Sequence, residues 1–289
     1  MGLDLTHSLD GELAVLATMH RKEEVIAPIL QGRLGLRVKV PMPFDTDRFG
    51  TFSGDIERKG SQLDAARAKI AAGFSSVPEA TVGIASEGSF GPDPLFPFVK
   101  LGRELVLLVD RETGFELAGH DATHETNFFH KPVTRVEDAL DFAVRIGFPD
   151  HGVIVTAFID NAPAPSVALF KGMTEADALK ASVEVVIGNH GVAFVGADMR
   201  ASWNPTRMKA IARATNDLVR RFESQCPNCG HRGFDVTMLV PGLPCSWCGE
   251  PTAVIKSKVL GCASCGHSKL VPATDQATAD PGRCDHCNP

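Results

Sequence analysis

The eight cysteines of this chain all lie in its last 64 residues, where they form four Cys-x-x-Cys pairs. The pairs are Cys226/Cys229, Cys245/Cys248, Cys262/Cys265 and Cys284/Cys287. Two thiolates three positions apart on a tight turn can reach one tetrahedral ion, so four such turns supply ligands for two closed Cys₄ zinc sites. A disulfide framework would be spread more widely and is typical of secreted proteins. We therefore expect two structural zinc ions and a reducing compartment, with the cytoplasm as the default location.

The cysteine spacing favours sequential pairing of the four turns. Cys226-Pro-Asn-Cys-Gly-His231 and Cys262-Ala-Ser-Cys-Gly-His267 share one pattern, and each is followed by a second pair after 15 and 18 residues respectively. This duplication predicts that the first two pairs bind one ion and the last two pairs bind the other. An interleaved, cross-braced arrangement remains the alternative.

Length and charge limit the classes of partner. The 289 residues are enough for an α/β body at residues 1–222, followed by a double Cys₄ zinc ribbon at residues 223–289. The net charge is −6, and the ribbon region carries five Lys/Arg against six Asp/Glu. Proteins that grip nucleic acid usually present a basic face, so this balance disfavours nucleic-acid binding. Neither a secretory signal nor an apolar run approaching the roughly 18 residues of a membrane helix is present, and no membrane association is expected.

Before the cysteines, hydrophobic periodicity alternates between strand and helix, which predicts an α/β body with a mixed sheet and flanking helices. The expected strands are Glu12–Thr18, Leu36–Val40, Thr81–Ala85, Glu104–Val109, Phe115–Ala118, Gly152–Ala157, Ser166–Phe170 and Gly191–Val195, with Asn127–His130 extending the Phe115–Ala118 sheet. The expected helices are Lys22–Gln31, Ser61–Ala72, Val136–Ile146, Glu175–Val186 and Pro205–Phe222.

Two polar segments follow predicted strands, where α/β folds place their ligands. Thr18, His20 and Lys22 lie at a predicted helix start and could hold a phosphate; a solvated basic helix start is the alternative. Glu87 comes directly after a buried strand and is a candidate metal ligand or general base, with an exposed turn as the alternative.

Two further segments carry candidate chemistry. Residues 43–58 interleave Asp45, Asp47 and Asp55 with glycines and hydroxyls, which suits magnesium unless the loop is simply solvated. Arg200 and Arg207 lie near Asp198 and Asn204 around a predicted helix start, which is typical either of an anion pocket or of an Arg–Asp lock.

In this order, the segments resemble the inosine/xanthosine triphosphate pyrophosphatases over about residues 13–118. The matching motifs are Ala17-Thr-Met-His20 with Lys22, Gly54–Gly60 leading to Ala66-Arg-Ala-Lys69, and Val82-Gly-Ile84 leading to Glu87-Gly88. His20 stands where that family usually has asparagine. The whole chain also resembles an uncharacterised bacterial family of unknown function, through Phe44-Asp-Thr-Asp47, Gly50-Thr-Phe-Ser-Gly54, Ala85-Ser-Glu-Gly-Ser-Phe-Gly91 and the terminal Cys-x-x-Cys-Asn-Pro.

These observations predict a magnesium-dependent hydrolase of a nucleotide or related phosphorylated small molecule. Asp45, Asp55 and Glu87 would hold the ion and orient a water. The phosphate charge would be neutralised by Thr18, His20, Lys22 and Lys69, with Arg200 and Arg207 as further candidates. The alternative function is a non-catalytic adaptor or ligand sensor, whose zinc ribbons bind a protein partner.

Overall fold

The computed structural model describes residues 8–50 and 60–289, which divide into two compact units. We call residues 9–219 the body; the other unit contains residues 220–289, which we call the tail. The mixed α/β class predicted from the sequence is confirmed. None of the helices in the described ranges combines the length and the hydropathy needed to cross a membrane.

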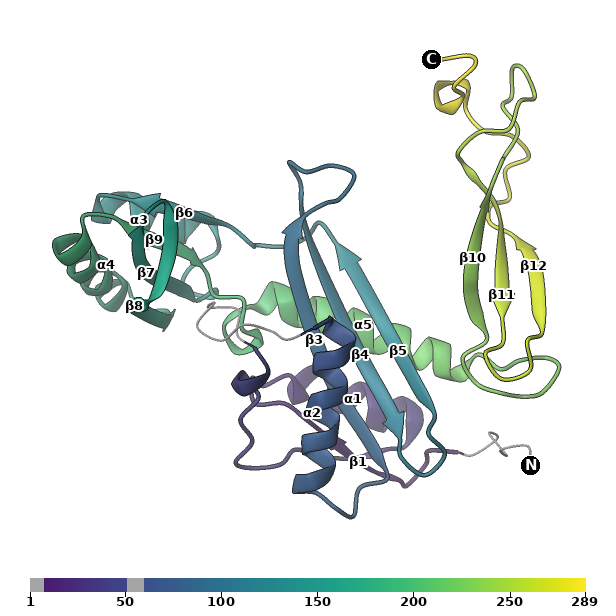
Figure 1. The fold of residues 1–289 in the computed structure, drawn as a ribbon, viewed down its shortest axis with the longest axis horizontal. Coiled ribbons are helices and arrows are strands. Elements are labelled where there is room, and N and C mark those ends of the chain that lie inside the picture. The colour runs from purple at the N-terminus through teal and green to yellow at the C-terminus, as the bar shows by residue number, and fades with distance from the viewer. Residues whose placement is uncertain (1–7, 51–59) are drawn as a thin grey trace. The chain divides into compact units, whose positions relative to one another are not determined.

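The first sheet of the body has five strands in the order β2-β1-β3-β4-β5. β1 runs parallel to β2 and β3, and the β3-β4 and β4-β5 pairs are antiparallel (Figure 1). The bounds are β1 Leu13–Leu16, β2 Arg37–Lys39, β3 Val82–Pro92, β4 Lys100–Asp110 and β5 Glu116–Thr123.

Strand β3 is much longer than the sequence predicts. It was expected to end at Ala85, but it pairs with β4 along its whole length, from Val82 opposite Asp110 to Pro92 opposite Lys100. Glu87 therefore lies inside a strand and not in a loop. β1 ends at Leu16, opposite Ile84, so β3 extends past its parallel neighbour and leaves a recess at the carboxyl end of β1.

Helices cover both faces of this sheet: α1 Glu23–Leu34, α2 Gln62–Ser76 and α5 Pro205–Glu223. α2 starts with a capping box at Ser61, whose hydroxyl accepts from the Asp64 amide at 3.2 Å while the Asp64 carboxylate accepts from the Ser61 amide at 3.0 Å. Ile70 of α2 packs over the β3 and β4 residues of one face. On the other face Gly119 lies directly against the α5 backbone, so α2 and α5 lie on opposite sides of the sheet (Figure 1).

The second sheet of the body is separate and fully antiparallel, in the order β6-β9-β7-β8. Its elements are β6 His130–Val133, α3 Val136–Arg145, β7 Val153–Ile159, β8 Ala162–Met173, α4 Ala176–His190 and β9 Ala193–Ala197. The expectation that residues 127–130 extend the first sheet is wrong, because His130 pairs with Gly196 of β9. Val155 and Val195 pack with α3 and α4 in the core, and alternation directs the intervening residues to the opposite face.

The tail is a three-stranded antiparallel meander with β11 in the centre. Its strands are β10 Asp235–Pro241, β11 Ile255–Gly261 and β12 Ser268–Pro272. Short 3₁₀ helices complete the described chain at Asp47–Phe49, Ala201–Trp203 and Pro281–Arg283.

Candidate functional site

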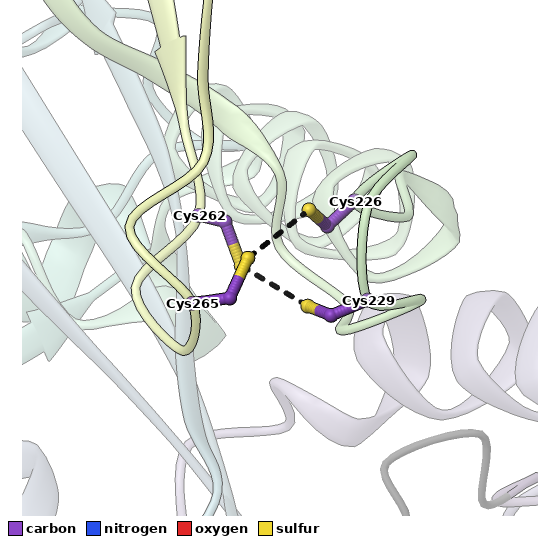
Figure 2. A group of neighbouring side chains, drawn as sticks. All are labelled: Cys226, Cys229, Cys262 and Cys265. Atoms are coloured by element: carbon purple, nitrogen blue, oxygen red, sulfur yellow. Dashed lines mark hydrogen bonds between the residues drawn. The ribbon is translucent and has the colours of Figure 1, made fainter.

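The first cysteine quartet lies at one end of the tail meander. Cys226 and Cys229 face Cys262 and Cys265 from an opposing turn, and all four sulfurs lie within 4.8 Å of one another (Figure 2). Across the two turns, Cys226 Sγ lies 3.7 Å from Cys265 Sγ, and Cys229 Sγ lies 3.7 Å from Cys262 Sγ. A tetrahedral ion with four bonds of roughly 2.3 Å to sulfur requires S–S edges of roughly 3.8 Å. The quartet therefore has the dimensions of a Cys₄ metal site and not of two disulfides, whose S–S bonds are about 2.05 Å.

The second quartet repeats this arrangement. Its members are Cys245, Cys248, Cys284 and Cys287. The sulfurs of Cys245 and Cys287 are 3.8 Å apart, and those of Cys248 and Cys284 are 3.6 Å apart. The tail therefore has ligand sets for two metal ions, and both sets are compatible with zinc.

The sequential pairing favoured by the sequence is wrong, because each quartet joins alternate turns. The physical reason is the meander. Each of β10 and β11 contains seven residues and spans about 23 Å at 3.3 Å per residue. Consecutive turns are therefore held at opposite ends of the sheet, and the first turn can meet only the third.

The backbone of each turn is arranged around its first cysteine. Gly230 donates to the Cys226 carbonyl at 2.8 Å, and Gly249 and Gly266 make the same contact with Cys245 and Cys262. All three glycines have positive φ, between 71° and 77°, which L side chains rarely adopt. At the last turn Asn288 donates to the Cys284 carbonyl at 2.8 Å. These backbone contacts hold the cysteines of each turn in position to act as metal ligands.

A polar pocket occupies the recess at the carboxyl end of β1 in the body. The described residues that line it are His20, Lys22, Thr46, Asp47, Gly50, Lys69, Glu87, Arg200 and Arg207. They include four Lys/Arg side chains, whose N–H groups are donors that an anion can accept from, and two carboxylates. Its volume of about 20 Å³ corresponds to little more than one water molecule, so it is too small to enclose a nucleotide.

Lys22 is buried in the lining of this pocket. Its side chain is 5% exposed, and Nζ donates to the carbonyl of Ser86 at 2.9 Å, on the part of β3 that extends past β1. Burial, followed by the positive charges of Arg207 and Lys69, lowers its pKa to about 7. Beside it, Lys69 and Glu87 form an ion pair with both side chains at least nine-tenths buried.

The two arginines of the pocket are each held by a buried carboxylate. Arg207 Nε lies 2.6 Å from Glu104 Oε1, and Arg200 Nη2 lies 2.6 Å from Asp198 Oδ2. Asn204 caps α5 by accepting from the Arg207 amide at 2.9 Å. The Arg–Asp lock is present at Arg200, and both paired guanidinium groups line the cavity.

The aspartates in residues 43–58 do not contribute to the site in the way that the sequence predicted. Asp47 lines the pocket, and its Oδ1 lies 3.0 Å from His20 Nε2. Burial lowers the pKa of His20, although the Asp47 bond opposes this shift. Asp45 is exposed and accepts from the Asp47 amide at 2.8 Å, and Asp55 lies outside the described residues. Thr18 is buried and accepts weakly from the His20 amide at 3.5 Å, behind the lining residues.

Sequence reasoning missed Glu104, which holds Arg207 from β4. The signal was a single carboxylate within the apolar run Leu101–Val109, since a charge inside a buried strand needs a partner. Thr46 and Gly50 also line the pocket, but no motif distinguished them. In the described ranges, groups of three or more potential metal ligands occur only as the two cysteine quartets, so Glu87 and Asp45 do not form a preassembled carboxylate site there.

The fold and these sites define an α/β protein with a tail whose cysteines form two interleaved metal-ligand sets. Residues 75–289 match the family described as Domain of unknown function (DUF6671), and the chain belongs to that family. The match covers the tail together with β3, Glu87 and both pocket arginines, which confirms the expectation of a family of unknown function. No curated protein matches the chain, and no resemblance to the pyrophosphatases is shown.

Proposed function

We propose that the body is a hydrolase of a nucleotide or related phosphorylated small molecule, and that its polar pocket binds the phosphate. The observation that carries the proposal is the buried side chain of Lys22, which lies with Lys69 and Glu87 where β3 extends past β1. Burying several cations around a small cavity costs free energy. A phosphoryl group would offset that cost by supplying negative charge and several acceptor oxygens.

Magnesium and zinc have separate roles in this proposal. Magnesium usually binds one or two carboxylates together with substrate phosphates, and we assign it to Asp47, which lines the pocket. Asp47 replaces Asp45 and Asp55, which the sequence assigned to the ion together with Glu87. When bound, magnesium would neutralise phosphate charge. Zinc is the ion we propose for both quartets, where four thiolates leave no open position for chemistry.

Hydrolysis would use Glu87 as the base. Water oxygen forms a bond to phosphorus, the bond from phosphorus to the leaving oxygen breaks with its electron pair, and Glu87 accepts the proton of the water. Lys69 now pairs with Glu87, so a phosphate that draws the Lys69 ammonium away would free the carboxylate. Lys22 and Arg200 would hold the phosphate during the displacement.

The test is phosphate release from a panel of nucleoside triphosphates, nucleoside diphosphates and sugar phosphates. The control reaction contains no added magnesium. No chelator is used, because a chelator would also remove the metal ions from the cysteine quartets of the tail. Glu87→Gln and Lys22→Met should lower turnover at least about a hundredfold, the lower end of typical acid–base contributions. Lys39→Met, an exposed lysine paired with Glu79, should keep wild-type turnover. Absence of turnover across the panel would rule the hydrolase out.

The adaptor remains a second candidate because the tail exposes apolar side chains. Met238 and Leu270 flank Val259 in one cross-strand row, and they are 60% and 64% exposed. Such a row suits a protein partner. The full chain should retain one defined partner in stoichiometric amount, and the Met238→Ser/Leu270→Ser double variant should lose that protein while keeping both metal ions. Equal retention of the partner by the wild-type chain and by the double variant would contradict the adaptor function.

A further inference from the structure

A second pocket lies on the face of the four-stranded sheet opposite α3 and α4. Its volume is about 350 Å³, within the range of small-molecule sites. Ile154 and Thr156 of β7 and Phe194 of β9 form its floor. Phe128, Phe129 and His130 form one wall, and Pro163, Pro165 and Met199 complete the lining.

Aromatic rings dominate this pocket. His130 and Phe194 have ring centroids 5.1 Å apart, and Phe128 meets His130 edge-on at 5.4 Å. Phe158 stacks on Phe194 with ring centroids 5.4 Å apart and an interplanar angle of 7°. Flat faces held in fixed orientations favour a flat ligand. Burial and the charge of Lys100 lower the pKa of His130, which keeps its imidazole neutral and able both to donate and to accept.

The aromatic pocket and the polar pocket have no lining residue in common, but residues of the two linings contact each other. Arg207 lines the polar pocket, and its Nη1 donates at 2.5 Å to the carbonyl of Met199, which lines the aromatic pocket. The Arg207 guanidinium also lies 5.4 Å from the ring centroid of Phe90, and Phe90 contacts Phe128 at 5.9 Å. The linings of the two pockets are therefore in direct contact at Arg207 and Met199.

We propose that the aromatic pocket binds the planar heteroaromatic ring of the ligand whose phosphate enters the polar pocket. This inference rests on the proposed function and narrows its substrate class to nucleotides. The polar pocket is too small for more than the phosphate end, so the rest of the molecule needs a second site. The aromatic pocket is large enough for a nucleobase and offers ring faces for stacking and one neutral imidazole for the base edge.

The test is calorimetric binding with three kinds of probe. Nucleoside monophosphates carry both groups, ribose 5-phosphate carries only the phosphate, and nucleosides carry only the ring. Loss of one stacking ring typically weakens base binding about tenfold. Phe194→Ala should therefore weaken nucleotide and nucleoside binding about tenfold and leave ribose 5-phosphate unchanged. Phe129→Ala, which removes a half-exposed wall residue, should act in the same direction if Phe194→Ala fails to fold. Phe98→Ala removes a fully exposed ring and is the matched control.

Each outcome bears on one of the two proposals. Ribose 5-phosphate binding that is lost in Lys22→Met supports the phosphate site, and its absence contradicts that site. Nucleotide binding no tighter than ribose 5-phosphate binding, or insensitive to Phe194 and Phe129, overturns the aromatic pocket and leaves the phosphate site standing. Failure of every nucleoside and nucleotide to bind overturns the aromatic pocket as well.

Discussion

Arg207 and Glu104 form an ion pair 2.6 Å long in which each side chain is only 1% exposed. The pair joins the first turn of α5 to the middle of β4, and Arg207 also donates to the Met199 carbonyl. Both side chains are buried, so neither can be rehydrated if its partner is removed.

Arg207→Met should lower the free energy of unfolding by about 3–5 kcal/mol, because it leaves the Glu104 carboxylate buried without this partner. The Arg207→Met/Glu104→Leu double variant should recover most of that loss, since well-packed apolar pairs often replace buried ion pairs without cost. Arg213→Met is the control on the same helix: its pair with Asp121 is half-exposed and should contribute at most about 1 kcal/mol. Denaturant unfolding of the four proteins measures these differences. A double variant as unstable as the single one would contradict this explanation.

Lys22→Met should stabilise the protein in a pH-dependent way. The pKa of Lys22 falls from 10.5 to about 7 on folding, so between these values the unfolded chain binds a proton that the folded chain does not. Wild-type stability should therefore rise with pH across this window, and the advantage of the variant should be largest near pH 7 and shrink toward pH 10. Thermal melts at matched pH values measure the difference. Lys39→Met provides the baseline, and an equal trend in that variant would remove Lys22 as its cause.

Metal content distinguishes the interleaved quartets from sequential ones. Cys229→Ser/Cys265→Ser removes two ligands of one quartet and should leave one zinc per chain. Cys229→Ser/Cys248→Ser damages both quartets and should leave none. Both variants carry two equivalent substitutions, so general destabilisation acts on them alike. The measurement is elemental analysis of the purified full chain, and sequential pairing would give the reverse result.

Gly119→Ala should destabilise the body, because the added Cβ would lie 2.3 Å from both the Ala214 carbonyl and the Leu218 amide of α5. These are backbone atoms, so the helix must shift, and overpacking of this kind typically costs about 1–3 kcal/mol. Gly91→Ala in β3 places its Cβ in open space and is the control. Equal melting temperatures for the two variants would show that α5 does not pack tightly on β5.

The structural features that the sequence predicted correctly depend on residues that are close together in the chain. The cysteine turns and the helix that starts after Asn204 are each determined within a few positions. The predicted strand ended at Ala85 because Ser86-Glu87-Gly88-Ser89 has the composition of a loop. Pairing with β4 makes it a strand, and no local propensity reports that pairing.

The parts of the candidate site that were missed depend on distant residues. Glu104 and Arg207 are separated by 103 positions, so the sequence shows two charges but not their contact. The predicted pairing of the cysteine turns was wrong for the same reason. The similarity of the two repeats suggested that adjacent turns share an ion, but which turns meet depends on the direction in which each intervening strand runs.

The meander of the tail also sets the distance between the two metal centres. Each strand carries the chain from one metal centre to the other, so strand length alone sets the interval between the centres. Inserting two residues into all three strands would separate the ions by about 7 Å more and return every side chain to its original face. The spacing of the two centres is therefore adjustable without altering a single sulfur ligand.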